Sequence, residues 1–300
     1  LKEAVQRHSI QRLGFEDAYM TVREHDAYAR ALPCELVPAA DLLAELRAVK
    51  DPEELEIMIA AQRIAEKALT DILNEIRPGV TEKEIAARLQ YLMLAGGAEN
   101  MSFDPIVASG PNGSMPHAVP TDRKIQDGDF VTMDFGCIYQ GYCSDMTRTV
   151  PVNGKFTPRQ RAVYESVLNM MTYAKKILKP GILKSEYERL VRVFAAGELV
   201  KLGLITPAQV AEKPSDPPIV RKYYMHGCSH FLGLDVHDVG EANPVVLPGM
   251  VFTVEPGIYI AEEGIGIRLE NDVLIGETEN IDLLGDVPLL PDDIERLMAR

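Results

Sequence analysis

A nine-residue segment occurs twice in this chain, and its recurrence limits the folds that the chain can adopt. Residues 128–136 (GDFVTMDFG) match residues 249–257 (GMVFTVEPG) at an offset of 121 positions. A second pair, residues 76–84 and 178–186, is offset by 102 and carries Pro-Gly after a helical pattern in both copies. Pro-Gly is common at helix ends and explains the second pair about as well as duplication does, but not the first. We predict a duplicated unit with an approximate two-fold axis and any functional site at the seam.

The elements around these segments occur in the same order twice. Asp51 and Pro52 are typical of a helix start, because they supply an N-cap and a first-turn proline before apolar residues at helical spacing. Thr81 begins a capping box for the next helix. The pattern predicts helices at 52–77, 81–96, 157–178 and 185–201, and β-rich segments at 101–152 and 223–276. The predicted fold class is therefore α+β, built from a helix–helix–strands unit that occurs twice.

Two further stretches lie outside this repeat. Residues 12–15 and 35–38 are predicted as strands, with a helix at 21–31 between them, and this piece is too small to form its own core. Residues 203–222 are rich in proline and are predicted as a loop insertion. A chain of 300 residues fits one large domain plus such a fragment.

Charge and hydropathy exclude two classes of partner. The net charge of −14 opposes binding to a phosphate backbone, so we expect no nucleic-acid partner. No uncharged run reaches the roughly 18 residues of a transmembrane helix, so we expect no membrane span. The four cysteines form no C-x-x-C pair, and residues 1–6 lack the apolar core of a signal peptide, which favours a cytoplasmic location. Because the chain starts with Leu, we expect it to begin inside a longer natural protein.

Acidic residues stand at matched positions of the two copies. Asp134 and Glu255 each end an apolar β-run, where an unpaired charge is expensive to bury. Each is followed along the chain by a second acid, Asp145 and Glu270 respectively. Four clustered carboxylates cannot all ionise without a counter-charge. We therefore expect protons or cations among them.

Each pair of acids fits a β-hairpin. Pairing Asp134 with Asp145 centres the first turn on residues 139–140, and the corresponding pairing in the second copy centres its turn on residues 262–263, directly before Gly264. Residues directly opposite one another in a hairpin have neighbouring side chains on one face of the sheet. The two-fold axis would then bring both pairs of carboxylates together.

Histidines near these strands could complete a ligand set. His226, His230 and His237 lie within one thirteen-residue segment, and His117 ends the segment 112–117. Oxygen-rich ligation with a single imidazole favours Mn²⁺ over the nitrogen and sulfur ligation usual for zinc, with Co²⁺, Fe²⁺ and Zn²⁺ as alternatives. The cysteines are expected to be free thiols, because the proposed hairpin points Cys137 and Cys143 to different faces.

Several motifs together resemble the pita-bread metallopeptidases, most closely the Xaa-Pro aminopeptidases and next the Xaa-Pro dipeptidases. The segments that carry the resemblance are MDFG at 133–136, SDMTRT at 144–149, the histidine-rich 226–238, VEPGIY at 254–259 and RLEN at 268–271. The resemblance implies a pita-bread (creatinase/aminopeptidase) fold. It implies a catalytic domain at 49–300 and a remnant of an amino-terminal creatinase-like domain at 1–48.

The resemblance also implies two divalent metal ions per chain, which we expect to be Mn²⁺. Asp134 would bind one ion, His230 and Glu255 would bind the other, and Asp145 and Glu270 would bridge the two. Paired ions of this kind lower the pKa of a bound water and stabilise a tetrahedral intermediate. Glu255 would also move a proton.

Five other residues match positions that the family uses without ligating metal. His117 and His237 would be catalytic, hydrogen-bonding the scissile carbonyl or the intermediate. His226, Tyr259 and Arg268 would bind substrate around the proline ring. Such a pocket must work by shape, since an X-Pro bond has no N–H. For Arg268, an ion pair with a neighbouring carboxylate is the alternative.

The expected function is that of a hydrolase: a metalloaminopeptidase that releases the amino-terminal residue from peptides with proline in the second position. The alternatives are an Xaa-Pro dipeptidase and a pita-bread module that binds peptides without turnover. Creatinase is disfavoured, because it lacks the metal-binding carboxylates. The expected partner is the peptide substrate, and a homodimer is left open.

Overall fold

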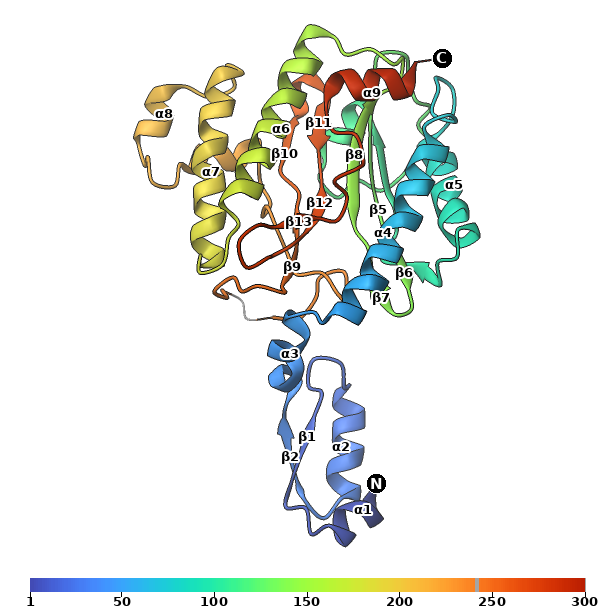
Figure 1. Cartoon of the computed structure of the whole chain (residues 1–300), viewed down its shortest axis with the longest axis vertical. Coiled ribbons are helices and arrows are strands. Elements are labelled where there is room, and N and C mark those ends of the chain that lie inside the picture. The colour runs from blue at the N-terminus through green and yellow to red at the C-terminus, as the bar shows by residue number, and fades with distance from the viewer. Residues whose placement is uncertain (241–242, 300) are drawn as a thin grey trace. The chain divides into compact units, whose positions relative to one another are not determined.

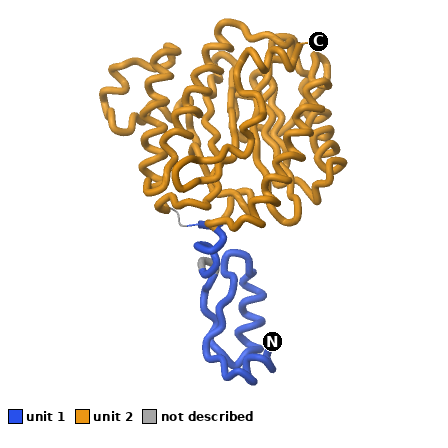
Figure 2. Tube along the Cα trace, in the orientation of Figure 1, with its two compact units in different colours: residues 1–47, 239–241 blue, residues 48–238, 242–300 orange. Residues whose placement is uncertain are grey.

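The computed structural model describes residues 1–240 and 243–299 (Figure 1). The chain divides into two compact units, residues 1–47 with 239–241 and residues 48–238 with 242–300, which Figure 2 shows in different colours. None of the helices in the described ranges has the length and apolar character that crossing a membrane requires. The larger unit holds every residue that the sequence marks as a candidate for the functional site.

The smaller unit contains the short α/β piece that the sequence predicts. Its parallel strands β1 (Arg12–Phe15) and β2 (Glu35–Pro38) are joined by α2 (Val22–Ala31), which begins after a capping box at Thr21. The remaining elements are α1 (Lys2–Arg7), η1 (Ala40–Leu43) and the first residues of α3 (Ala44–Ala48). No residue of α2 is buried, so this unit has little core of its own.

Four long helices of the larger unit confirm the predicted order. They are α4 (Pro52–Ile72), α5 (Glu82–Ala95), α6 (Pro158–Ile177) and α7 (Lys184–Lys201). Capping boxes precede the first three, because the Asp51, Thr81 and Thr157 side chains accept hydrogen bonds from backbone N–H groups of the first turn. Helix α4 ends five residues before the predicted 77, and a turn leads from it to Pro78. The predicted loop insertion at 203–222 instead contains two short helices, α8 (Pro207–Ala211) and η3 (Pro218–Lys222).

The first hairpin differs in register from the prediction. Its strands are β5 (Phe130–Phe135), β6 (Cys137–Tyr139), β7 (Tyr142–Cys143) and β8 (Met146–Pro151), with β3 (Asn100–Met101) and β4 (Ile106–Ser109) alongside. Asp134 lies opposite Thr147, so the predicted pairing of Asp134 with Asp145 is wrong by two residues. The turn is centred on Gln140 and Gly141, whose positive φ angles of 46° and 84° are typical of tight hairpin turns. Moving the turn by one residue moves every partner by two, so Asp145 keeps its predicted face.

The second hairpin has the predicted register. Its strands are β9 (Val251–Val254), β10 (Gly257–Ile260), β11 (Ile265–Arg268) and β12 (Asn271–Leu274), with β13 (Ile281–Asp282) at one edge. The pairs Val254–Asn271 and Gly257–Arg268 continue one register across residues 255 and 270. Glu255 therefore lies opposite Glu270, as predicted. The turn contains η4 (Ala261–Glu263) and ends at Gly264, whose φ is +62°.

Backbone pairing confirms the internal duplication. An isolated antiparallel bridge joins Thr81 to Lys124, and a second joins Leu183 to Val245. Thr81 and Leu183 are 102 positions apart, and Lys124 and Val245 are 121 positions apart. These are the two offsets found in the sequence. Backbone hydrogen bonds flanking the bridges recur at the same offsets. In Figure 1 the strands of both copies lie between the pair α4–α5 and the pair α6–α7.

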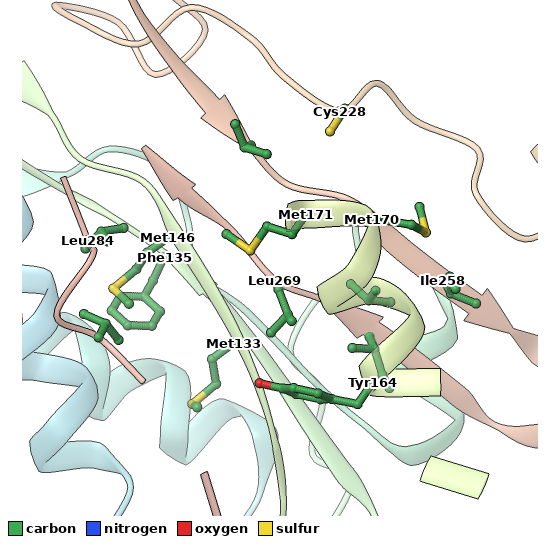
Figure 3. Packing of buried hydrophobic residues seen from close by; sticks show 14 of the residues in the cluster. Met133, Phe135, Met146, Tyr164, Met170, Met171, Cys228, Ile258, Leu269 and Leu284 are labelled. Atoms are coloured by element: carbon green, nitrogen blue, oxygen red, sulfur yellow. The ribbon is translucent and has the colours of Figure 1, made fainter. Parts of the chain in front are cut away.

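The central strands are buried along their full length. Every residue of β5, β8, β9, β10 and β11 is buried. Figure 3 shows part of the apolar cluster around them, including Phe135, Met146 and Leu269. Polar side chains on these strands are therefore out of bulk water, and each needs a partner inside the protein.

Gly136 provides a test of how closely the first hairpin is packed. A Cβ atom at this position would lie 1.8 Å from the carbonyl oxygen of Ser144, so Gly136→Ala is expected to lower the free energy of unfolding by about 2 kcal/mol or more. Gly197→Ala, in exposed helix surface with no atom within 4 Å of the new Cβ, should raise it by up to about 1 kcal/mol. Urea denaturation measures both. Equal stability of the two variants would contradict the described packing.

Candidate metal centre

One pocket brings together nearly all of the residues that the sequence marks as functional. Its volume is about 370 Å³. Tyr259 is the one predicted site residue that is not in its lining. The other nine predicted site residues all line the pocket: His117, Asp134, Asp145, His226, His230, His237, Glu255, Arg268 and Glu270.

Four carboxylates reach this pocket from the ends of strands. Asp134 is the penultimate residue of β5, Asp145 precedes β8, and Glu255 and Glu270 face each other between the paired strands of the second hairpin. Burial raises the pKa values of Asp145 and Glu270 well above their usual range, with nearby carboxylates adding to the effect. Burial likewise raises the pKa of Glu255 to about 8. Without a cation, this pocket therefore favours protonated acids.

His230 presents an uncharged ring nitrogen to the carboxylates. Its Nδ1 donates a hydrogen bond to the carbonyl of Phe231 at 2.9 Å. Its Nε2 lies 3.6 Å from Oδ2 of Asp145 and 3.5 Å from Oε1 of Glu255. Burial lowers the pKa of His230 to about 4, so near neutral pH the Nε2 lone pair faces these oxygens. A lone pair and carboxylates repel one another unless a proton or a metal ion lies between them.

The geometry fits a divalent cation. Ligand atoms of Asp145, His230 and Glu270 all lie within 4.8 Å of one another. The Oδ1 atoms of Asp134 and Asp145 are buried, and in the described part of the chain neither has a hydrogen-bond partner. Buried carboxylate oxygens without a donor are costly, and a metal ion satisfies them. The assignment of Asp134 and Glu255 to a second ion stays a prediction.

Arg268 links two of the carboxylates, Asp134 directly and Glu270 through a hydroxyl. Its guanidinium donates to Oδ2 of Asp134 at 2.5 Å and to the hydroxyl of Tyr259 at 2.7 Å. Its Nε donates to the hydroxyl of Thr147 at 3.1 Å, and that hydroxyl donates to Oε2 of Glu270 at 2.6 Å. Arg268 thus has the ion pair that the sequence leaves open as the alternative. Its predicted contact with a proline ring stays a prediction.

Tyr259 lies behind His226 rather than in the pocket lining. The Tyr259 hydroxyl accepts from Arg268 and therefore donates to Nε2 of His226, 2.9 Å away. The Nδ1 of His226 donates to the carbonyl of Gly227 at 2.8 Å. Burial lowers the pKa of His226 to about 4 and raises that of Tyr259 to about 12. His226 is therefore neutral with both nitrogens engaged, which leaves its ring carbons for an apolar contact.

The two remaining histidines lie at the pocket mouth. His117 and His237 are exposed, and the ring of His237 packs edge-on against His230 with centroids 4.3 Å apart. The two histidines follow equivalent strand segments of the two copies. Ser109, which precedes His117, pairs with Val131, and Phe231, which precedes His237, pairs with Phe252. Val131 and Phe252 correspond at the offset of 121. Each copy thus contributes one exposed histidine to the pocket from an equivalent place.

Two polar residues that hydrogen-bond to the predicted acids are missing from the sequence-based set. One is Thr147, which occupies the place opposite Asp134 that the mistaken register gives to Asp145. The other is Asp272, a fully buried carboxylate that accepts a hydrogen bond from the backbone N–H of Asp145 at 3.3 Å. The signal for Asp272 in the sequence is its spacing of two residues from Glu270, which places both acids on one face of a buried strand.

Comparisons with known proteins agree with this geometry. The model of metallopeptidase family M24 matches residues 56–277. The chain is 39% identical over 287 residues to an Xaa-Pro aminopeptidase of Escherichia coli, and 38% identical over 242 residues to an Xaa-Pro dipeptidase of Pyrococcus furiosus. These matches cover 89% and 79% of this chain, which spans 63% of the length of each relative. A solved structure of a proline aminopeptidase P II from Yersinia pestis has a TM-score of 0.88 at 34% identity, covering 96% of this chain and 72% of that one.

The raised carboxyl pKa values predict a pH dependence of stability for chelator-treated protein. His226 and His230, with pKa values lowered from 6.5 to about 4, favour folding as pH rises to 6.5 and add nothing further above it. Glu255, raised to about 8, favours folding at low pH and loses that contribution as pH rises through 8. Stability should therefore fall between pH 6.5 and 8, where only the acids contribute.

Urea denaturation at both pH values measures this effect. Adding Mn²⁺ should reverse the loss at pH 8, because the ion replaces the protons as counter-charge. Glu255→Gln should make the loss between pH 6.5 and 8 smaller in the chelated protein, with Asp145 and Glu270 supplying the rest. A chelated wild-type protein that is equally stable at both pH values, with no response to Mn²⁺, would argue against a buried acid cluster that binds cations.

Proposed function

The chain belongs to metallopeptidase family M24 and has the α+β pita-bread fold that its sequence predicts, and from this we propose that it is a metal-dependent Xaa-Pro aminopeptidase. It would release the amino-terminal residue from peptides whose second residue is proline. The observation that carries the proposal is the convergence of Asp145, His230 and Glu270 in one pocket. The names of the similar proteins support the preference for proline.

The proposed metal site uses the chain's own acids and one imidazole. Asp145, His230 and Glu270 would hold the metal, with Asp134 and Glu255 completing the five-residue set. When bound, the metal would supply Lewis-acid chemistry, lowering the pKa of water and polarising a carbonyl. The oxygen-rich donors favour Mn²⁺. The persistence of all five residues supports turnover over a binding module without catalysis.

Proton transfer falls to Glu255 in this proposal. Hydrolysis of an X-Pro bond needs a group that takes a proton from the attacking water and returns one to the departing proline nitrogen. Glu255 lies in the pocket lining, and its Oε1 is 3.5 Å from Nε2 of His230, so its carboxylate would lie beside a water held among these ligands. His117 and His237 line the same pocket and would donate hydrogen bonds to a substrate carbonyl.

Recognition of proline would rest on shape, because the scissile X-Pro bond offers no N–H. The pocket lining includes the apolar side chains Phe103, Ile106 and Val236. The neutral ring of His226 lies in the same lining with both nitrogens already hydrogen-bonded. A five-membered ring could pack on these surfaces without leaving a polar group unpaired.

An Xaa-Pro dipeptidase is the second candidate function. The similar protein of that name from Pyrococcus furiosus is about as close in sequence as the aminopeptidase relative. Rates on Gly-Pro and Gly-Pro-Gly distinguish the two. An aminopeptidase is expected to favour the tripeptide, and a dipeptidase only the dipeptide.

Asp145→Ala should abolish metal binding and hydrolysis together. The substitution removes a candidate metal ligand and its buried oxygens, so metal content and kcat/KM on Gly-Pro-Gly should fall, the latter by about 1000-fold or more. Asp127→Ala removes an exposed carboxylate outside the pocket and serves as the matched control. Hydrolysis that persists after chelation, or that prefers bonds without proline, would reject the proposal.

Metal identity and cellular setting are further parts of the proposal. Protein purified from cytoplasm is expected to contain about two manganese ions per chain, as paired-metal hydrolases do. Elemental analysis measures this number directly. Light scattering on the same sample tests the homodimer. A different dominant metal would overturn the manganese assignment without touching the assignment of the ligands.

A further inference from the structure

Both ends of the segment that carries His117 are tied to a single buried carboxylate. This segment, the strap, comprises residues 109–121 and runs from the end of β4 through η2 (Gly110–Ser114). The carboxylate belongs to Glu82, the first residue of α5, and no part of Glu82 is exposed to solvent. The strap is therefore hydrogen-bonded to a helix that contributes no residue to the pocket lining.

Glu82 accepts five hydrogen bonds, all of them from the strap in the described part of the chain. Its Oε1 accepts from the backbone N–H and the hydroxyl of Ser109, both at 2.7 Å. Its Oε2 accepts from the side-chain amide of Asn112 at 2.9 Å. The same oxygen accepts from the backbone N–H of Thr121 at 3.0 Å and from its hydroxyl at 2.6 Å. One side chain thus joins the two ends of the strap, Ser109 and Thr121, which we call its feet.

The helix itself does not need this carboxylate. The amino terminus of α5 is capped by the reciprocal hydrogen bonds of Thr81 and Glu84. The position of Glu82 corresponds, at the offset of 102, to Lys184 in the second copy, so the duplicated fold does not require an acid there. The acid is particular to the copy that carries the strap.

Two other contacts hold the middle of the strap. Gly113 lies so close to Gly266 that a Cβ on Gly266 would come within 1.6 Å of the Gly113 carbonyl oxygen. Arg268 donates a hydrogen bond to the carbonyl of Pro116 at 3.1 Å. The next residue, His117, lies in the pocket lining. With the feet held by Glu82, the backbone before His117 has little freedom to move.

We propose that Glu82 is a positioning residue that holds His117 in place for hydrolysis. The inference rests on the proposed function only through the role given to His117. A histidine that donates a hydrogen bond to a reacting carbonyl must be held to within a fraction of an ångström, and the rigidity of its supporting segment sets that precision. Glu82 acts through the strap and does not touch the pocket.

Glu82→Gln tests this role with almost no change of shape. Each carboxylate oxygen faces a backbone N–H, one from Ser109 and one from Thr121. The amide has a single acceptor oxygen, so either orientation places its NH₂ group against one of these N–H donors. A hydroxyl could rotate to accept instead, but a backbone N–H cannot. One foot of the strap should therefore detach.

The matched control is Glu84→Gln, which alters the same helical turn but faces the cap rather than the strap. On Gly-Pro-Gly, E82Q should lower kcat by about tenfold, with KM and metal content changed by less than about twofold. E84Q should keep kcat within about twofold of wild type. Combining E82Q with His117→Ala should give no loss beyond that of His117→Ala alone, because Glu82 acts through His117.

The imidazole signals of His117 in NMR spectra provide a readout that needs no activity. Assigned by their absence in His117→Ala, they should shift or broaden in E82Q and stay unchanged in E84Q. This arm still decides the inference if wild-type protein fails to hydrolyse X-Pro bonds. If E82Q does not fold, Thr121→Val, which removes only the hydroxyl donor, should give a smaller effect in the same direction.

Three results would overturn the proposal. The first is an E82Q variant with wild-type kcat and unchanged His117 signals. The second is an equal loss of kcat in E82Q and E84Q. The third is a loss of kcat from E82Q that is as large in the His117→Ala background as in the wild-type protein. The last two would show that Glu82 stabilises the protein without acting on His117.

Discussion

Carboxylates buried among apolar strands need positive charge beside them, and Arg268 supplies the part that comes from the chain itself. It is paired with Asp134, and through Thr147 it reaches Glu270. One guanidinium cannot neutralise four acids. Burial, to which the neighbouring carboxylates add, raises the pKa values of Asp145, Glu255 and Glu270. Among the described residues, no hydrogen-bond donor reaches Oδ1 of Asp134 or Oδ1 of Asp145. The affinity for divalent cations follows from this deficit of positive charge.

The site is asymmetric because the two copies of the duplicated unit differ at equivalent places. Glu255 faces Glu270 in the second copy, whereas Asp134 faces Thr147 in the first. In the second hairpin Arg268 lies opposite Gly257. In the first hairpin the observed register places Asp145 opposite Gly136, the residue that corresponds to Gly257 in the repeat. An acid in one copy thus takes the place of a base in the other. This exchange turns a symmetric scaffold into an asymmetric site.

Local signals in the sequence were sufficient for the four long helices, and with the family resemblance they identified nine residues of the pocket lining. Caps at Asp51 and Thr81 marked helix starts correctly, because capping depends on residues within one turn. The register of the first hairpin was wrong by two, because the sequence does not say that Gln140 adopts a positive φ. The face of Asp145 was still right, since a shift of two preserves alternation. Thr147 and Glu82 gave no signal, because threonine in a strand and glutamate in a first helical turn are ordinary.

The sequence by itself determined that a unit is duplicated, where its helices lie and which acids and histidines end its β-runs, because repeats and periodicity are properties of neighbouring residues. Tertiary structure alone decided which of those groups meet. The pairing of Arg268 with Asp134 joins residues 134 positions apart, and the lone pair of His230 reaches carboxylates from both copies. Such contacts depend on packing between distant segments, which no local pattern encodes, and on a strand register that the sequence predicted for the second hairpin but not for the first.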